Sequence, residues 1–173
     1  RDISVCLEFR RVLFRSPDEI VTPVTWFNTA SYGKRARQSD RNHRGSLTNT
    51  VEADVIVQML RRWGECTDFI GWLEQPSAHA HAIGIICAYA AQRDLLKRKI
   101  AMAAIHPSLQ AALKVDTIDS YQGKENPIVI VSLVRNNWDG SKRDGINTIR
   151  PGFLAKENRI NVRSEEHTSE LQS

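Results

Sequence analysis

The stretch Val115–Asn137, "VDTIDSYQGKENPIVIVSLVRNN", holds two short apolar runs separated by a polar break. The runs Val115–Ile118 and Ile128–Val134 are rich in β-branched residues, which is typical of buried strands. Strands buried on both faces are typical of parallel sheets, in which ligands bind at the carboxyl ends of the strands. The break follows the first run, so it is either a ligand-binding turn or an ordinary polar loop that carries a glycine.

Upstream of this stretch, strand and helix patterns alternate. Thr22–Thr29 is a β-branched and aromatic run, whereas Ser31–Ser46 has no periodicity and is expected to be a loop. Apolar residues at helical spacing predict a helix over Thr50–Trp63, and Asn49 and Glu52 have the spacing of a capping box at its start. A buried strand over Ala82–Tyr89 and a helix over Ala91–Ile105 follow. The order β-α-β-α-β-β predicts an α/β fold, with a mostly parallel sheet and helices on both faces.

Composition sets broad limits on the class of protein. The chain has 173 residues, 41% of them hydrophobic and 25% charged, which is enough for one domain with a buried core. Its net charge of +4 permits a polyanionic partner without requiring one. Three scattered cysteines favour a reducing, intracellular compartment, cytoplasmic or nuclear, over a disulfide framework. We expect no membrane partner, because no apolar run approaches the roughly 18 residues of a span, and no metal site, because His79 and His81 lack further ligands.

Both ends of the chain need a separate interpretation. Leu7–Ser16 and Arg163–Ser173 resemble translations of sequencing-adapter DNA, and such scars are excluded from fold reasoning. The alternative is a basic amphipathic start and a polar tail. On the first interpretation residues 1–16 and 163–173 are artefacts with no partner in the core, and residues 17–162 form an incomplete domain.

The order of residues in Val115–Glu125 resembles motif V of superfamily-one DNA/RNA helicases, in the group that contains the nonsense-mediated-decay helicase. Members of that group read close to Val-Asp-(Ser/Thr)-(Val/Ile)-Asp-(Ser/Ala)-(Phe/Tyr)-Gln-Gly-(Arg/Lys)-Glu, and this sequence matches every position. Ile83–Lys97 is similar to motif IV, and Gly152–Val162 is similar to the beginning of motif VI. The resemblance implies a second RecA-like lobe of the helicase motor, truncated here, which closes over ATP and grips single-stranded DNA or RNA.

The resemblance also implies roles for individual residues. It places Gln122, Gly123, Lys124 and Glu125 on the ATP side of the loop, with Glu125 toward the ribose or phosphate edge. It places another set near the nucleic-acid strand: Asp119, Ser120, Tyr89, Gln92 and Arg93. Motif IV departs from the family because Cys87 and Ala88 stand where Thr-Pro is usual, which removes a hydroxyl that commonly meets a phosphate. The following helix N-terminus keeps the N–H groups that can bind phosphate.

Two parts of the motor are absent from the sequence. There is no G-x-x-x-x-G-K-[ST] phosphate loop, so ATP and Mg²⁺ are expected to be bound mainly by the missing N-terminal lobe of the parent protein. The finger arginine of motif VI is also missing, because Arg163 stands where the family has an alanine. Arg159 is an earlier arginine of the motif, for which a surface or packing role is an equal alternative to a functional one. No catalytic set is complete, so the chain alone is expected to be inactive.

A second functional class stays open. The lobe is also consistent with a non-catalytic α/β module that binds nucleic acid or protein. The basic run Lys34–Arg44 is compatible with phosphate contacts and equally with a solvated loop.

Overall fold

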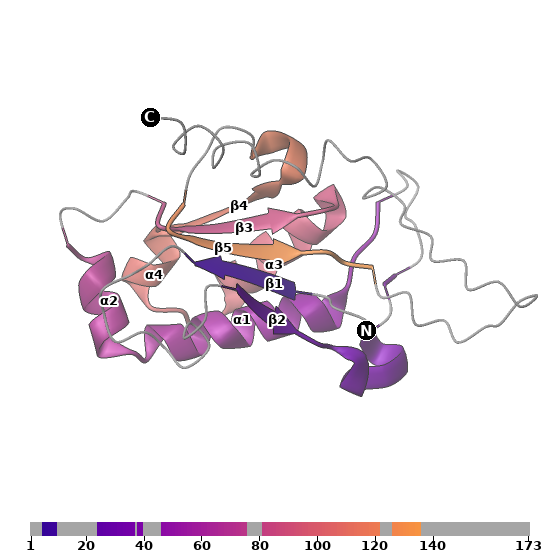
Figure 1. Cartoon of the computed structure of the whole chain (residues 1–173), viewed down its shortest axis with the longest axis horizontal. Helices are drawn as coiled ribbons and strands as arrows, with labels where there is room; N and C mark the ends of the chain where they lie inside the picture. The colour runs from indigo at the N-terminus through magenta and orange to yellow at the C-terminus, as the bar shows by residue number, and fades with distance from the viewer. Residues whose placement is uncertain are drawn as a thin grey trace, which may run out of the picture.

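The computed structural model describes residues 5–9, 24–36, 38–39, 46–75, 81–121 and 126–135. Within them the chain forms one five-stranded sheet and four α-helices (Figure 1). The strands are β1 (Val5–Phe9), β2 (Val24–Phe27), β3 (Ile83–Cys87), β4 (Leu113–Thr117) and β5 (Ile128–Ser132). The helices are α1 (Thr50–Gly64), α2 (Thr67–Leu73), α3 (Ala90–Met102) and α4 (Pro107–Ala111), with two short 3-10 helices, η2 (Ala30–Ala36) and η3 (Ile118–Ser120).

The sheet has the strand order β2-β1-β5-β3-β4. Strand β3 pairs in parallel with the edge strand β4 on one side and with β5, the central strand, on the other. Strand β1 runs antiparallel to both β5 and β2. The predicted α/β fold with a mostly parallel sheet is therefore confirmed, and continuous apolar runs form its parallel strands β3 and β5.

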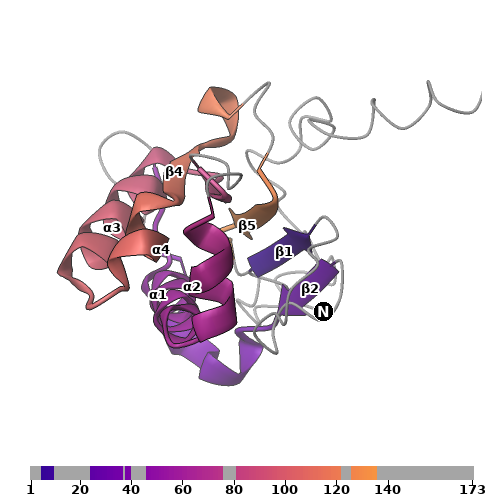
Figure 2. The same cartoon turned by 90° about the vertical axis from the view of Figure 1, so that its left-hand side faces the viewer.

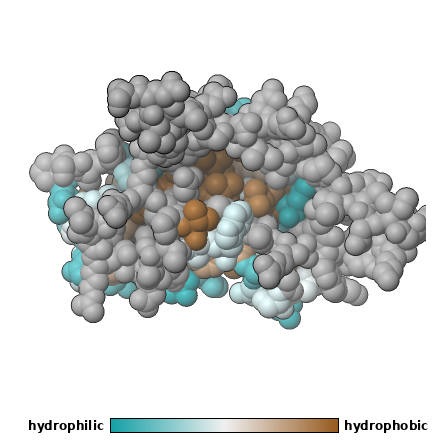
Figure 3. Space-filling view, in the orientation of Figure 1, coloured by the Kyte–Doolittle hydropathy of each residue, from teal (hydrophilic) through white to brown (hydrophobic). Residues whose placement is uncertain are grey.

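The four described helices all lie on one face of the sheet (Figure 2), rather than on both faces as the sequence predicted. The connections from β2 to β3 and from β3 to β4 move across the sheet in the same direction. Because crossovers between parallel strands are right-handed, two crossovers in one direction place their helices on the same face. Figure 3, which views the other face, shows hydrophobic residues near the centre of the molecule.

The core lies between the helices and the sheet. Alternate residues of the central strands point toward the helices, so Ile83, Ile85 and the facing residues of β5 are fully buried. From the helices, the core receives one stripe of α1 (Ile56, Met59, Leu60, Trp63) together with Phe69 of α2, Leu96 of α3 and Leu109 of α4. The helix predicted over Thr50–Trp63 is confirmed as α1, with one more residue at its end.

Strand β1 corrects the expectation that Leu7–Ser16 has no partner. Val5–Phe9 lies between β2 and β5, with Val5 opposite Phe27 in one neighbour and Ser132 in the other. The expectation rested on side chains, whereas a strand is added to a sheet through backbone N–H and C=O groups, which any extended segment carries. The expectation is therefore wrong for the first three residues of that segment.

Two further boundaries differ from the sequence expectation. The segment Ser31–Ser46, expected to be a loop, begins with most of η2, a 3-10 helix that is too short to give a periodic sequence pattern. Within η2, Gly33 takes a positive φ of 55°. The strand expected over Val115–Ile118 begins earlier and ends at Thr117, and Ile118 opens η3 as a buried residue. No helix in the described ranges is long and apolar enough to cross a membrane.

Candidate functional site

The carboxyl ends of three parallel strands lie side by side. In the register of the sheet, Cys87 at the end of β3 is opposite Thr117 of β4 and Ser132 of β5. The residues that follow these strands therefore emerge at one edge. Because ligands of parallel α/β sheets bind at this edge, it is the candidate site.

The predicted ATP-facing turn, Gln122–Glu125, lies outside the described residues, but both of its flanking residues are placed. Tyr121 Oη donates a hydrogen bond to Asn126 Oδ1 at 2.7 Å, and Asn126 Nδ2 donates to the His81 carbonyl oxygen. Both side chains cross β3 at Gly84, where an added Cβ would come within 2.1 Å of Tyr121 Oη. Glycine at position 84 therefore lets the ends of the turn be joined over the sheet.

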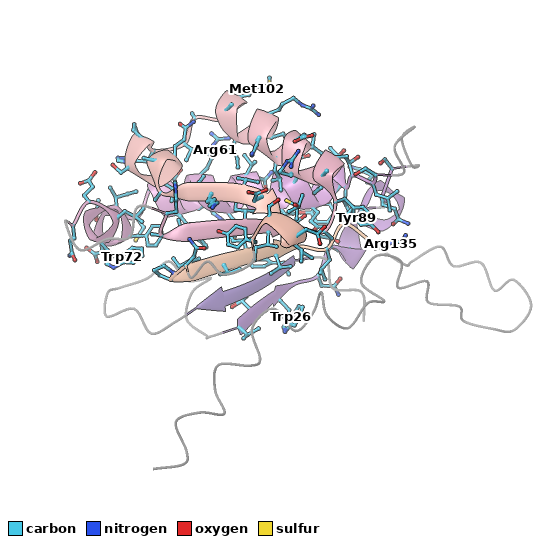
Figure 4. All side chains as sticks on the ribbon, turned by 90° about the horizontal axis from the view of Figure 1, so that it is seen from above. Trp26, Arg61, Trp72, Tyr89, Met102 and Arg135 are labelled. Atoms are coloured by element: carbon cyan, nitrogen blue, oxygen red, sulfur yellow. The ribbon has the colours of Figure 1, made fainter. Side chains whose placement is uncertain are left out.

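Tyr89 follows β3 and meets a residue that the sequence analysis did not single out. Arg135 lies three residues beyond the end of β5, and its Nε donates to Tyr89 Oη at 2.7 Å. The guanidinium carbon lies 6.0 Å from the centre of the tyrosine ring, at the outer limit of a cation–π contact. Figure 4 shows both side chains at the same end of the sheet. The structure thus brings an aromatic ring and a cation together at the candidate edge.

Asp119 and Ser120 lie in η3, directly after β4. Both are exposed, and Thr117 Oγ1 donates a hydrogen bond to Ser120 Oγ at 3.2 Å. Because β4 is next to β3 in the sheet, these two residues lie one strand away from Tyr89 at the same edge.

The two predicted contacts on α3 differ in their surroundings. Arg93 is partly exposed, and its guanidinium pairs with Asp94 at 2.8 Å, a surface pair of small energetic worth. Gln92 is fully buried: its Oε1 accepts from the Asn49 N–H at 2.8 Å and its Nε2 donates to the Asn49 carbonyl at 3.1 Å. The Gln92 amide is therefore engaged inside the protein rather than presented at the edge.

The N-terminus of α3 also uses backbone donors internally. Ala91 N–H donates to Ser46 Oγ at 3.0 Å, and the N–H groups of Gln92 and Arg93 both donate to the Tyr89 carbonyl. A phosphate at this helix end would have to displace Ser46 to reach Ala91. Side chains at the strand ends are therefore the better candidates for anion contacts.

A buried polar group connects the first turn of α1 to the end of β5. Asn49 Oδ1 accepts from the Glu52 N–H at 3.0 Å, which is the expected helix cap. The Glu52 side chain does not complete the capping box. Its Oε2 instead accepts from the Val134 N–H at 2.9 Å. Asn49 Nδ2 donates to the Val134 carbonyl at 3.1 Å and to the Ala36 carbonyl at 2.9 Å.

Burial perturbs the titratable groups beneath the edge. Desolvation raises the pKa of Glu52 from its ordinary value of 4.5 to about 8, and the nearby side chain of Ser132 and the backbone of Val134 and Leu133, just after β5, oppose this rise. Glu52 Oε1 and Ser132 Oγ are both buried with no well-formed hydrogen bond among the described residues. Burial, and then the charge of Glu52, raises the pKa of Cys87 to about 12, so this thiol is not a nucleophile at neutral pH. Burial, and then Asp116, raises the pKa of Tyr121 to about 12.

Sequence reasoning missed Arg135 as a site residue and treated Asn49 and Glu52 only as helix caps. The signal for Arg135 was present, because a charged residue just after a buried strand lies at the carboxyl edge of a parallel sheet. No local signal identifies Glu52, since its partner Val134 is 82 residues away. The described residues contain no group of three or more His, Cys, Asp or Glu side chains placed to hold a metal ion.

Comparison with known proteins identifies the family. The sequence pattern of the AAA domain family matches residues 8–164, most of the chain. The chain belongs to this AAA domain family. As an AAA domain with parallel strands and flanking helices, it has a RecA-like α/β fold.

Several relatives of this AAA domain are helicases by name. The Homo sapiens DNA replication ATP-dependent helicase/nuclease DNA2 is 32% identical over 150 residues, which cover 82% of this chain and 12% of that protein. The Schizosaccharomyces pombe helicase required for RNAi-mediated heterochromatin assembly 1 is 31% identical over 127 residues, 73% of this chain and 11% of that protein. The Gallus gallus putative helicase MOV-10 is 32% identical over 122 residues, 68% of this chain and 12% of that protein. This AAA domain is therefore of the helicase type, and the chain spans 11% or 12% of the length of these three relatives.

Proposed function

We propose that this chain is the second RecA-like lobe of an ATP-dependent helicase or translocase, the lobe that closes over ATP and grips single-stranded nucleic acid. The observation that carries the proposal is the shared edge of β4, β3 and β5. There, Asp119 and Ser120 follow β4, Tyr89 follows β3, and the segment that holds the motif V turn leaves the edge toward Gly84 at the other end of β3. Membership of a helicase-type AAA family supports the same reading.

In this proposal one loop meets both ligands. Gln122–Glu125 face the nucleotide, while Asp119 and Ser120, just before Tyr121, face the nucleic-acid strand. A loop that touches both ligands couples them, because closure over ATP and grip on the strand shift the same element. ATP and Mg²⁺ are held mainly by the N-terminal lobe of the parent protein, which is the partner of this lobe.

The strand contacts are then Asp119, Ser120, Tyr89 and Arg93. Gln92 is left out of this set because its amide is engaged by the Asn49 backbone. Its role is to join the start of α1 to the start of α3, which fixes Tyr89 and Arg93 relative to the rest of the edge.

Binding of labelled single-stranded oligonucleotides to the whole chain tests the proposal. Fluorescence anisotropy at fixed low salt should show binding of DNA or RNA that weakens as salt is added, since phosphate contacts release counterions. Ser120→Ala should weaken this binding. Ser108→Ala is the matched control, because its hydroxyl lies on α4 and donates to Glu74 at 2.6 Å, away from the edge.

Two results would contradict the proposal. One is the absence of any salt-dependent binding by the unaltered chain. The other is an equal effect of both serine variants, which would mean that the strand does not pass over η3.

A further inference from the structure

The segment that leaves β5 contains a strained turn. Val134 has a φ of 70°, and Arg135 N–H donates to the Leu133 carbonyl at 2.8 Å across it. This is the geometry of the rarer, strained form of the γ-turn. A β-branched residue avoids positive φ because its Cβ crowds the backbone. Such a conformation persists only where the surroundings impose it, and it points to a functional constraint.

Two buried side chains at the start of α1, those of its N-cap Asn49 and of Glu52, impose this conformation. Glu52 Oε2 accepts from the Val134 N–H, and Asn49 Nδ2 donates to the Val134 carbonyl. Glu52, Asn49 and Val134 are all fully buried. Both polar backbone atoms of the strained residue are thus held by the first turn of one helix.

The result of the turn is the position of the next residue, Arg135. Its Nε donates to Tyr89 Oη at 2.7 Å, so the plane of the guanidinium is oriented by a residue already placed at the candidate edge. Guanidinium groups recognise phosphate oxygens through paired N–H donors and stack with aromatic rings. An arginine beside a tyrosine is a combination suited to the phosphate and the base of one nucleotide in a single strand.

We propose that Arg135 contacts a phosphate group of the bound nucleic-acid strand, and that Glu52 and Asn49 are positioning residues that set Arg135 through the strained turn at Val134. This rests on the proposed function, because it takes the strand to lie across the carboxyl ends of β3, β4 and β5. It adds a contact from the end of β5 and a buried support from α1.

The direct test compares two arginine variants of the whole chain. Arg135→Ala should weaken binding of a single-stranded oligonucleotide about tenfold and lower the slope of log affinity against log salt by about 0.7, the value for one lost phosphate contact on a single strand. Arg98→Ala removes the same charge from an exposed position near the other end of α3 and should leave the slope unchanged. Arg135→Lys should recover only part of the affinity, because lysine lacks the planar fork.

The outcomes separate this inference from the proposed function. If the unaltered chain binds no oligonucleotide, the proposed function fails and this inference fails with it. If the unaltered chain binds and Arg135→Ala matches Arg98→Ala in affinity and slope, the proposed function stands and the Arg135 contact is wrong. If Arg135→Ala weakens only a fluorescent ATP analogue, the phosphate belongs to the nucleotide and the inference is overturned.

The positioning role has its own readout. Glu52→Ala should weaken oligonucleotide binding, and combining it with Arg135→Ala should add no further loss, because both changes remove the same contact. Glu52→Gln keeps an acceptor for Val134 N–H and should restore binding. Additive losses would overturn the positioning role. Should Glu52→Ala fail to fold, Tyr89→Phe replaces it, because it removes only the hydroxyl that orients Arg135. If the losses of oligonucleotide binding in Tyr89→Phe and Arg135→Ala were additive, the positioning of Arg135 by its neighbours would again be overturned.

Discussion

At the scale of single residues, the most unusual feature is a carboxyl group in the core. Glu52 is fully buried, one of its oxygens holds Val134 N–H, and the other has no well-formed hydrogen bond among the described residues. A buried carboxyl avoids the cost of desolvating a charge by staying protonated, which is why its pKa rises to about 8. Near neutral pH, Glu52 therefore acts mainly as an uncharged group.

The raised pKa predicts how stability depends on pH. Between about pH 4.5 and pH 8 the folded protein holds a proton on Glu52 that the unfolded chain releases. The contribution of Glu52 to the free energy of unfolding is therefore highest below about pH 4.5 and falls as the pH rises through about 8, by on the order of a few kcal/mol. Glu52→Gln removes this dependence, so its stability relative to the unaltered chain should grow across that range in urea unfolding. Glu65→Gln, an exposed position after α1, should follow the unaltered chain at every pH. Parallel curves for Glu52→Gln and the unaltered chain would contradict the prediction.

A second residue-scale prediction concerns the motif V loop in a full-length parent protein. Glu125→Ala should slow ATP turnover and leave nucleic-acid binding without ATP nearly unchanged, because affinity for the strand comes mainly from phosphate contacts and stacking elsewhere. Asp119→Ala and Ser120→Ala should weaken strand binding and its stimulation of the ATPase. Steady-state ATPase with and without oligonucleotide, beside anisotropy at fixed salt, separates the two effects. If Glu125→Ala abolished strand binding and left turnover intact, the orientation of the loop would be the reverse of the one proposed.

At the scale of secondary-structure elements, the contact between β3 and the motif V loop decides how the loop is held. Tyr121 and Asn126 join the ends of the loop and pass over Gly84. Strand β3 is also the middle of the three parallel strands. The ends of the loop are thus held over an inner strand of the sheet, between β5 and the edge strand β4.

This contact predicts that Gly84→Ala destabilises the domain. The added Cβ would lie 2.1 Å from Tyr121 Oη, so the tyrosine has to move and its hydrogen bond to Asn126 is lost. We expect a loss of about 1–3 kcal/mol in the free energy of unfolding. Gly71→Ala is the matched control: nothing lies within 4 Å of its added Cβ, and a helical glycine replaced by alanine should stabilise α2 slightly. A neutral Gly84→Ala variant would show that the loop ends are not held at β3.

At the scale of the whole molecule, the parallel strands present one ligand-binding edge, and the described helices all support the sheet from the same face (Figure 2). The sequence contains no phosphate loop. A phosphate loop and a finger arginine supply most of the stabilisation of the transferring phosphoryl group in related motors. The proposed lobe therefore depends on a second lobe for chemistry.

We accordingly predict that the purified chain shows no ATPase activity. The finger arginine alone is worth roughly 10³–10⁵ in rate in related NTPases, and the phosphate loop is missing as well. The measurement is phosphate release with Mg²⁺ and ATP, with and without oligonucleotide, using Glu125→Ala as the background. Turnover above that background would refute the prediction.

The ends of the chain give a prediction about the gene. If Leu7–Ser16 and Arg163–Ser173 derive from adapter DNA, re-sequencing the source transcript should not find them in frame. Genomic DNA that encodes both segments would refute the artefact interpretation. The pairing of β1 with β5 does not bear on this origin, since backbone pairing requires no particular side chains.

The sequence by itself determined the succession of β2, α1, β3, α3, β4 and β5 and the start of α1, but it did not predict the short helices α2 and α4. The predicted elements depend on local patterns: apolar runs for β3, β4 and β5, and the cap of Asn49 on Glu52 N–H. Tertiary structure alone decided where β1 pairs, that the described helices lie on one face of the sheet, and that the Gln92 amide is hydrogen-bonded to the Asn49 backbone. It also decided that Glu52 meets Val134 and that Tyr89 meets Arg135, residues 82 and 46 positions apart. The physical reason is that burial and hydrogen-bond partners depend on which distant segments pack together, and no local pattern encodes that packing.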